Sequence, residues 1–541
     1  MDDTTGQGET TGNGSISQQG SDAAPATAGM ETELKLAFRS DDLGKLTAFF
    51  GADPRSSGKR RLSTTYFDTA DAALRDKGLA LRVRRDGRRY VQTVKGENET
   101  SGGALCRREI EAPVRSSSPD LAAIPDPVIA DLVQRSSLAG LKPVFRVDVE
   151  RISLKGPAAT PGVSVDIDVG EVKAGRRRAP ICEVELESKG ASLQALYKLA
   201  LQLHQSVPLR VSKVTKSDTG YRLRAGDAPA PSKAAKLKLP ADATAEQALN
   251  AIVSSCLDQL IANEPCVVAT KDPEGIHQMR VALRRMRSSF RLFRQLLPAG
   301  QYDEIVGELR WLTSVLGPAR DWDVFSAEIV GPVLAYLPEH EGLNVLQRRT
   351  DARRGRARRT AQEGVASPRF TALVLTLGQW LAESAWRHQD LSETSARLFA
   401  PARVFAADAI ARRFKAVRKL GRRIETLPVA ERHRLRIEVK KLRYAIEFFG
   451  SLFNRADVKS FARRLASLQD DLGYLNDVAV AAHLAGEVAE ASRSPDREHL
   501  RAAEGLLIGW HGHAVAVHED DLVRDVRQVL KAKRFWEADR P

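Results

Sequence analysis

The stretch ETELKLAF (31–38) alternates charged and mostly apolar residues. Successive side chains on a β-strand point to opposite faces, so Glu31, Glu33 and Lys35 share one face. The opposite face includes Leu34 and is largely apolar. The stretch therefore predicts a strand with one ionic and one apolar face.

The same alternation recurs between Glu31 and about Leu223. The further runs are LALRVRR (79–85), YVQTVKG (90–96), LCRREIEA (105–112), VFRVDVERISL (144–154), VSVDIDVGEV (163–172) and ICEVELES (181–188). Turn residues such as Asp86-Gly87 and Gly102-Gly103 separate some of them, and helical patterns interrupt at 41–50 and 192–205. We expect an antiparallel sheet with a few helices.

The ionic faces carry both signs in similar supply. Besides those of 31–35, they hold Arg82 and Arg84; Thr93 and Lys95; Arg107, Glu109 and Glu111; Asp166 and Asp168; and Glu183, Glu185 and Glu187. The residues between them are apolar: Leu34, Val83, Val94, Ile110, Ile167, Val184 and Leu186. For a single strand, a solvated ionic face explains the pattern. For six strands together, a closed sheet with its charges inside is the alternative, and it needs a filling because buried charges must be paired or liganded.

A polyanion with divalent cations would satisfy both signs in such a cavity. Arginine and lysine bind phosphate oxygens, and carboxylates hold Mg²⁺ or Mn²⁺. Together these groups are the machinery of metal-assisted phosphoryl transfer to water.

The chain changes character after the segment GDAPAPSKAAKLKLPADAT (226–244), which is rich in Pro and Ala and is typical of a linker. From 245 to the end the apolar period is helical. Residues 1–29 are rich in Gly, Ser, Thr, Gln and Ala, which indicates a disordered tail.

The helical half repeats itself at an offset of 156 residues. HQMRVALRRMRSSFRLF (277–293) aligns with HRLRIEVKKLRYAIEFF (433–449), and the same offset pairs LGPARD (316–321) with LGYLND (472–477). The repeat predicts two similar helical bundles related by an approximate two-fold axis.

Each copy carries a basic stripe on one helix face. The residues, spaced by three and four, are His277, Arg280, Arg284, Arg287 and Arg291, then His433, Arg436, Lys440 and Arg443. A solvated basic face is the alternative for one helix, but the duplication favours a cationic channel or saddle. We expect Asp321 and Asp477 to be turn or capping residues that brace the arginines, and this half to bind rather than catalyse.

Composition limits the class of protein. Of 541 residues, 43% are hydrophobic and 28% are charged, as in a folded globular chain. The net charge is +14, and residues 1–29 hold four acidic and no basic residues, so the remainder has a surplus of +18. An anionic partner follows from that surplus. Four cysteines without a CxxC pair, no apolar run of spanning length and no signal peptide lead us to expect a cytoplasmic protein without membrane insertion.

Residues 30–225 resemble the CYTH domain, the triphosphate tunnel metalloenzymes. The resemblance lies in E-x-E-x-K (31–35), YFDT (66–69), LRVR (81–84), TVKG (93–96), R-x-E-x-E (107–111), VERISL (149–154), D-V-G (168–170), E-V-E-L-E (183–187) and Lys216 before Gly220-Tyr221. It implies an eight-stranded antiparallel tunnel that hydrolyses a triphosphate chain with two metal ions, Mg²⁺ or Mn²⁺.

The resemblance also implies roles for residues. Glu31, Glu33, Lys35 and Glu185 would be catalytic. Lys35, Arg82, Arg84, Lys95, Arg107, Arg151 and Lys216 would bind phosphate. Glu31, Glu33, Glu109, Glu111, Asp168, Glu183, Glu185 and Glu187 would bind metal and orient the attacking water. Arg146 and Arg151 cannot both face inward on a regular strand, and Lys216 is preferred over Lys213 for its spacing.

Residues 245–535 resemble the CHAD domain, a histidine-containing α-helical module that is often joined to CYTH. The duplicated H-x-x-R-x-x-x-R-x-x-R stripe, followed each time by LG-x-x-[RN]-D, carries this resemblance. It implies two four-helix bundles that bind inorganic polyphosphate through the nine residues of the stripes. Lys440 in place of arginine, and Asn476 opposite Arg320, make the copies unequal.

Together these observations predict a cytoplasmic inorganic triphosphatase, α+β in its first half and all-α in its second, associated with polyphosphate granules. No tryptophan lies in the strand region, and its strand aromatics (Tyr66, Phe67, Tyr90 and Phe145) sit singly, which favours an all-phosphate substrate. The alternatives are a polyphosphate-binding protein with a vestigial tunnel and an enzyme for thiamine triphosphate or ATP. Sequence-specific nucleic-acid binding is not expected, because groove-reading motifs and interleaved aromatics are lacking.

Overall fold

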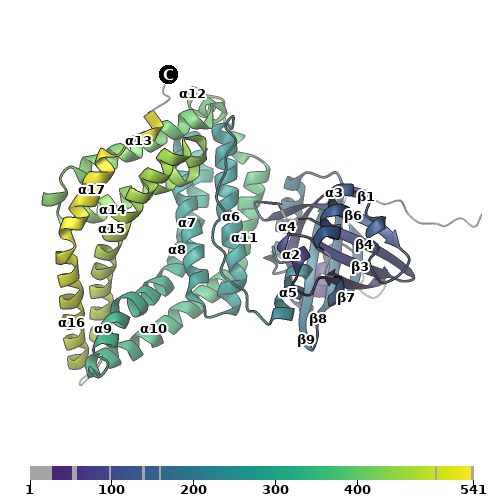
Figure 1. The fold of residues 1–541 in the computed structure, drawn as a ribbon, viewed down its shortest axis with the longest axis horizontal. Coiled ribbons are helices and arrows are strands. Elements are labelled where there is room, and N and C mark those ends of the chain that lie inside the picture. The colour runs from purple at the N-terminus through teal and green to yellow at the C-terminus, as the bar shows by residue number, and fades with distance from the viewer. Residues whose placement is uncertain are drawn as a thin grey trace, which may run out of the picture.

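A computed structural model of the chain describes residues 27–51, 58–96, 99–136, 140–157, 160–493 and 496–537. The strands and a few short helices gather in one part of the molecule, and the long helices gather in the other (Figure 1). The predicted order, an α+β half followed by an all-α half, is confirmed.

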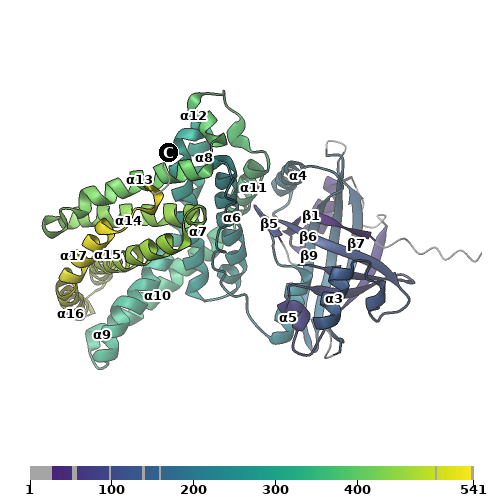
Figure 2. The ribbon, with the colours of Figure 1, turned by 45° about the horizontal axis from the view of Figure 1, so that its top comes forward.

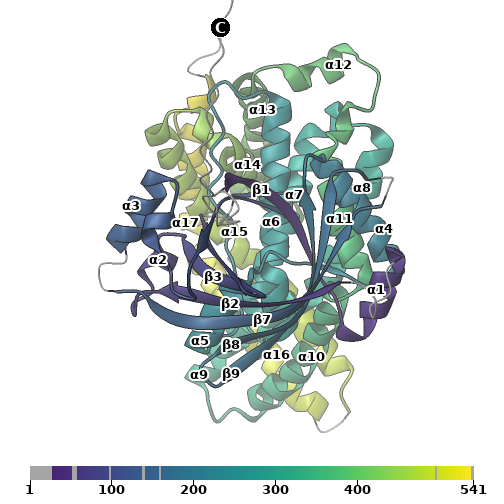
Figure 3. The same ribbon diagram turned by 90° about the vertical axis from the view of Figure 1, so that its right-hand side faces the viewer.

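Eight antiparallel strands close into a ring. They are β1 (Thr27–Ala37), β2 (Lys59–Asp68), β3 (Ala80–Asp86), β4 (Arg89–Lys95), β6 (Ala104–Val114), β7 (Lys142–Lys155), β8 (Val163–Ala174) and β9 (Arg177–Ser188). The order is β1-β9-β8-β7-β2-β3-β4-β6, and the pairing of β1 with β6, from Thr27↔Glu111 to Glu33↔Leu105, completes the circle. Two short strands, β5 (Glu99–Ser101) and β10 (Arg210–Val211), extend its edges. The strands curl around a central space, as Figure 3 shows.

The apolar faces of the strands point outward and are buried under helices. Helix α4 (Leu193–Ser206) packs on β1 and β9, so that Leu34 and Leu186 share a core with Leu196. The short helix α2 (Ala73–Asp76) and helix α3 (Pro127–Ser136) give the same cover to β3, β4 and β6. All seven apolar residues predicted to pack between the charges are buried. The ionic faces are therefore left for the interior.

Several elements of this half differ from the sequence prediction. β1 begins at Thr27, so the last three residues of the predicted tail are strand, because they pair with β6; residues 1–26 lie outside the described part. The expected helix at 41–50 is a 3-10 turn (Ser40–Asp42) followed by α1 (Leu43–Phe49). Three helices were not predicted: the one-turn helix α2, α3 and α5 (Lys216–Ala225).

The segment between α5 and α6 has no regular structure but is held against the helical half. The Ser232 backbone N–H donates to the side chain of Asn263, and the Leu239 N–H donates to Ser451 Oγ. The two halves also touch directly, since α4 packs against α11.

The helical half follows the predicted repeat. The first copy contains α6 (Ala245–Ala269), α7 (Pro273–Phe293), α8 (Ala299–Val324), α9 (Gly331–Tyr336), α10 (Glu341–Val365) and α11 (Pro368–Ala382). After the one-turn helix α12 (Glu393–Ala396), the second copy contains α13 (Ala402–Gly421), α14 (Val429–Phe449), α15 (Arg455–Glu490), α16 (Asp496–Val517) and α17 (Glu519–Lys531). Helices α7 and α14 begin and end 156 residues apart, which confirms the offset.

One element breaks the symmetry. Helix α15 is continuous, whereas its counterpart α8 passes through a π-helical turn (Phe325–Val330) into α9. Pro332 explains the break, because proline lacks the N–H of the α-helical ladder and its ring crowds the preceding turn. The equivalent position in α15 is Val488, which keeps the helix intact.

The copies join through buried aromatic rings. Phe293 and Phe449, which are equivalent in the repeat, both pack on Phe405, with ring centroids 4.5 and 5.9 Å away. Helices α7 and α14 are in contact, as are α6 with α13 and α10 with α16. No helix of the described residues is long and apolar enough to span a membrane.

Candidate active site and cationic cavity

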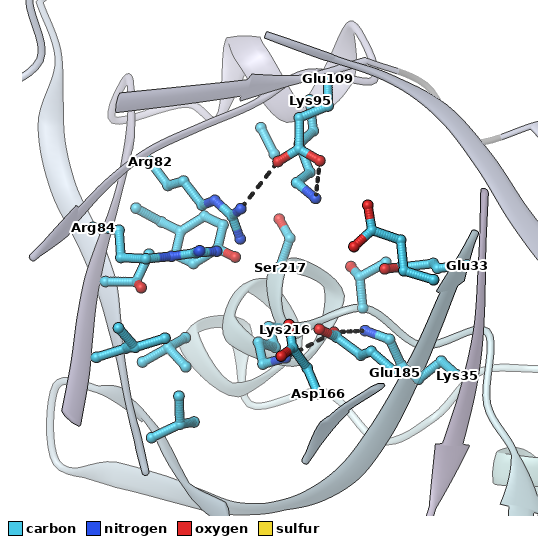
Figure 4. Close-up of a pocket in the computed structure, with 18 of the residues that line it drawn as sticks. Glu33, Lys35, Arg82, Arg84, Lys95, Glu109, Asp166, Glu185, Lys216 and Ser217 are labelled. Carbon is cyan, nitrogen blue, oxygen red and sulfur yellow. Dashed lines mark hydrogen bonds and ion pairs between the residues drawn. The ribbon is translucent and has the colours of Figure 1, made fainter. Parts of the chain in front are cut away.

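The barrel encloses a cavity of about 830 Å³ lined by charges of both signs. Figure 4 shows side chains from strands around the ring pointing into this space, with Ser217 entering from α5. Alternation explains the lining: the outer residues of each strand are taken by the core, so the alternate residues must face inward.

One side of the cavity holds a compact ionic cluster. Arg151 of β7 makes a bidentate pair with Asp168 of β8 at 2.6 and 2.7 Å, and its guanidinium also reaches Glu185 of β9 at 2.8 Å. Lys216, the first residue of α5, lies 2.7 Å from Asp168 and 2.9 Å from Glu185, and it also contacts Glu183. Lys35 of β1 lies 3.2 Å from Glu185 and 3.4 Å from Glu183.

The cluster keeps its members charged despite burial. Burial opposes the charge of Lys35, but Glu183 and Glu185 outweigh it and raise the pKa of Lys35. Burial likewise opposes ionisation of Glu185, yet Lys216, Lys35 and Arg151 hold the pKa of its carboxyl well below the ordinary value. The pKa of Lys216 is raised well above its ordinary value, since Asp168 and the two glutamates outweigh burial.

The opposite side is richer in cations. Glu109 of β6 lies 3.2 Å from Arg82 and 2.9 Å from Lys95. Arg84 has no carboxylate within 4.0 Å in the described part of the chain, and the neighbouring Arg82, followed by burial, lowers the pKa of Arg84 to about 10. An anion placed between these two arginines would relieve their repulsion.

Most of the predicted tunnel residues meet in this cavity. Those that line it are Glu33, Lys35, Arg82, Arg84, Lys95, Glu109, Glu111, Arg151, Glu185, Glu187 and Lys216. Asp168 and Glu183 stand behind them and pair with the cationic residues. The side chains of Glu31 and Arg107 lie outside the described residues, although the backbone places the two opposite each other in β1 and β6.

The structure separates the two ambiguous pairs. Arg151 points inward, whereas Arg146 is exposed and pairs with Asp148 on the outer face. Lys216 reaches the carboxylates, whereas Lys213 pairs with Asp258 of the helical half.

The sequence prediction missed the aromatic and apolar part of the lining. Tyr66 faces the cavity and stacks on Phe145 with ring centroids 4.6 Å apart, and Phe145 meets Tyr221 edge-on at 5.1 Å. The expectation that the strand aromatics sit singly is therefore wrong. Leu62, Val147 and Val149 continue this wall, on which alternate residues of β2 and β7 face inward.

Asp166 was also missing from the predicted site, although its parity with Asp168 on β8 was the signal. It lines the cavity and pairs with Arg151. Helix α5 adds Thr215, Ser217 and Asp218 at one end of the barrel. These residues could have been found through the T-x-x-D capping box at 215–218, which the structure contains.

The acidic residues fit a divalent cation. One ligand atom from each of Asp168, Glu183 and Glu185 lies within 4.8 Å of the others. Carboxylate oxygens are the ligands that Mg²⁺ and Mn²⁺ prefer. The interleaved lysines and arginine would then be available to phosphate oxygens.

A second cavity, of about 540 Å³, lies between the two helical copies. Its basic lining residues are His277, Arg280, Arg284, Arg320, Arg436 and Lys440. The remaining predicted stripe residues, Arg287, Arg291, His433 and Arg443, are not among those that line it. His433 is exposed, and Arg443 donates to Gln469.

Asp321 and Asp477 face this cavity at equivalent positions. Each lies 3.8 Å from an arginine of the same copy, Arg280 and Arg436 respectively. The prediction that they are turn or capping residues is wrong, because both lie inside the long helices α8 and α15. Burial, with Asp477 adding to it, raises the pKa of Asp321.

The cavity is not symmetric in its chemistry. Lys440 occupies the position that Arg284 has in the first copy. Burial is the largest cause that lowers the pKa of Lys440 to about 7, and Arg436 and Arg284 add to the effect. Burial and then Arg320 lower the pKa of His277.

The geometry thus defines a closed β-barrel whose interior carries charges of both signs. The barrel is joined to a duplicated helical domain with a cationic cavity. The family profile of the CYTH domain matches residues 29–221, and that of the CHAD domain matches residues 251–486. The chain therefore contains a CYTH domain followed by a CHAD domain.

Individual relatives cover parts of the chain. An inorganic triphosphatase of Haemophilus influenzae is 26% identical over 163 residues, which are 30% of this chain and 46% of that protein. An uncharacterized protein of Mycobacterium tuberculosis is 28% identical over 249 residues, 43% of this chain and again 46% of that protein. The chain thus spans about half the length of these curated relatives. The CHAD domain of the plant Ricinus communis is 32% identical with a TM-score of 0.49, covering 56% of this chain and 98% of that structure.

Proposed function

We propose that the barrel hydrolyses inorganic triphosphate to pyrophosphate and phosphate in a metal-dependent reaction, and that the helical half binds inorganic polyphosphate. The observation that carries the first part is the cavity lined by both signs, with one arginine unpaired in the described residues. The similarity to an inorganic triphosphatase supports it.

In this proposal the cationic side of the cavity binds the phosphate chain. Arg82, Arg84 and Lys95 lie together there, and Lys35, Arg151 and Lys216 reach in from the other side. Arg107 belongs to the same set by its place on β6. Fixed guanidinium and ammonium groups would stabilise the charge that develops on the phosphoryl oxygens.

The carboxylates have two tasks. Asp168, Glu183 and Glu185 would hold Mg²⁺ or Mn²⁺. Glu31, Glu33, Glu109, Glu111 and Glu187 would add ligands where they face the phosphate chain. A bound divalent cation supplies charge neutralisation and makes a coordinated water more acidic. Glu33, which points into the cavity in Figure 4, would orient the attacking water.

The test is phosphate release from triphosphate by the full chain, with and without EDTA. Release that requires Mg²⁺ or Mn²⁺ is expected. A chain that binds metal and triphosphate but releases no phosphate would instead support the vestigial-tunnel alternative.

A second candidate is an organic triphosphate. The wall formed by Tyr66, Leu62, Val147 and Val149 favours it, because organic groups bind against apolar and aromatic surfaces. A panel of inorganic triphosphate, thiamine triphosphate, ATP and long polyphosphate, compared by kcat/KM with each metal, separates the candidates.

For the helical half, the cavity lined by Arg280, Arg284, Arg436 and Lys440 supports phosphate-chain binding. Arg287, Arg291, Arg443 and His433 lie on the same helices and would contact parts of a chain outside the cavity. Competition tests specificity: polyphosphate should remain bound when duplex or single-stranded DNA is added at equal phosphate concentration and moderate salt. Such binding would place the protein in the cytoplasm at polyphosphate granules, which imaging of the tagged full chain can check.

A further inference from the structure

The segment that precedes Lys216 also pairs with the strand that carries Lys35, so it connects two lysines of the cavity. Strand β10 pairs with β1, and the Ser212 N–H donates to the carbonyl oxygen of Lys35 at 2.9 Å. Four residues later the chain enters α5 at Lys216, with a capping box between Thr215 and Asp218 at the start of the helix. Any shift of this segment therefore moves the start of α5 relative to β1.

Helix α6 of the helical half holds this segment through two ion pairs. Lys213 Nζ lies 2.9 Å from Asp258 Oδ1, and both side chains are largely buried, at 16% and 17% exposure. Upstream, Arg210 lies 2.7 Å from Glu264. Figure 2 shows α6 beside the barrel at the end where β5 lies.

Asp258 also forms a hydrogen bond with a second part of the barrel. Its Oδ1 accepts a hydrogen bond of 3.0 Å from the backbone N–H of Gly103, in the turn between β5 and β6. Strand β6 carries Glu109, which pairs with Arg82 and Lys95 in the cavity. A single carboxylate of the helical half thus contacts two barrel segments that lead to opposite sides of the site.

The surroundings of Asp258 leave little room for movement. Gly103 has a φ of +100°, and a Cβ there would lie 2.8 Å from Ile261 Cδ1. The hydroxyl of Tyr197 donates to the Gly102 carbonyl at 2.6 Å, and its ring fits against Gly378 of α11. The contact between the halves is therefore close-packed at this point.

We propose that Asp258 is a positioning residue for the tunnel site: it holds Lys213, and through it the start of α5, so that Lys216 meets Asp168 and Glu185. The inference rests on the proposed function, in which Lys216 binds phosphate. It makes the helical half part of the tunnel's architecture even when no polyphosphate is bound. A misplacement of about 1 Å in such a group costs about a hundredfold in rate.

The experiment uses full-chain variants and two readouts. Asp258→Ala and Lys213→Met remove the ion pair, and Lys213→Arg keeps it. Glu383→Gln is the matched control, because Glu383 is another helical-half carboxylate that contacts the barrel half, at Gln194 rather than in the segment 210–216. The readouts are kcat and KM for triphosphate, and amide hydrogen exchange over residues 210–220.

Asp258→Ala and Lys213→Met should lower kcat/KM about tenfold or more and speed exchange at Ser212 and Val214. Lys213→Arg should retain the wild-type kcat/KM and exchange rates, and Glu383→Gln should change neither quantity. Wild-type kinetics and exchange in Asp258→Ala would overturn the proposal, because a merely structural contact lowers stability without changing the turnover of folded protein. An equal loss of kcat/KM in Glu383→Gln would overturn it too. If the wild-type chain releases no phosphate, the proposed function fails, and the exchange comparison then decides the positioning by itself.

Discussion

The barrel cavity and the helical cavity are both cation-rich, but they treat carboxylates differently. In the barrel, Lys35, Arg151 and Lys216 interlock with three carboxylates that lie within reach of one ion. In the helical half, Arg280 and Arg436 each have one looser aspartate partner at 3.8 Å.

Under the proposed function, this difference in carboxylate content is what distinguishes a catalytic site from a binding site. A site that hydrolyses a phosphoanhydride bond needs anionic groups to hold the metal and orient the water, as well as cationic groups to bind the substrate. A site that only holds a polyanion needs the cationic groups.

The largest effect is expected for Glu33→Ala. Removal of one preorganised group of an active site typically costs about 10²–10³ in kcat, so phosphate release should nearly vanish while polyphosphate binding stays unchanged. Circular dichroism checks the fold, and Arg434→Ala, at an exposed position of the helical half, serves as the control. Undiminished turnover would contradict the role of Glu33.

The converse change is Arg284→Glu with Lys440→Glu. Reversing two charges in the helical cavity should weaken polyphosphate binding about a hundredfold at moderate salt, measured by titration calorimetry. Triphosphate turnover should be spared, because neither residue lines the barrel cavity. Loss of turnover would mean that the two cavities act as one site.

Lys440 should make polyphosphate binding depend on pH. Its pKa in the free protein is about 7, and a bound anion raises the pKa of a nearby lysine. The stabilising charge is therefore fully present below pH 7, and affinity should fall as the pH rises from 7 to 9, by at most about tenfold per pH unit. Lys440→Arg should flatten the profile, and an unchanged slope in that variant would assign the dependence to another group.

The smallest effect is expected for Asn476→Arg, which restores the symmetry with Arg320. One added phosphate contact should strengthen polyphosphate binding severalfold at low salt and steepen its salt dependence by about one unit. Affinity measured across a salt series checks this, with Asn476→Gln as the uncharged control. A weaker complex would show that the two copies bind the chain differently.

Sequence patterns predicted most of the barrel because its strands obey a period of two. Strand β2 escaped the pattern, since Lys59-Arg60-Arg61 and Ser63-Thr64-Thr65 offer little apolar alternation; its place is set by pairing with β3 and β7. Helix α5 escaped too, because KSDTGYRLRA has almost no apolar face. The inward aromatic wall was missed because Tyr66 and Phe145 are distant in sequence and meet only through the β2–β7 pairing.

The alternation that puts charges on one strand face and the repeat of 156 residues are local periods of the chain, so the order of the amino acids alone specifies them. The inward direction of Arg151 rather than Arg146, the lowered pKa of Lys440 and the contact of Asp258 with Lys213 arise only in the folded chain. These outcomes depend on ring closure and on the packing of the halves, which bring together residues that no sequence spacing relates.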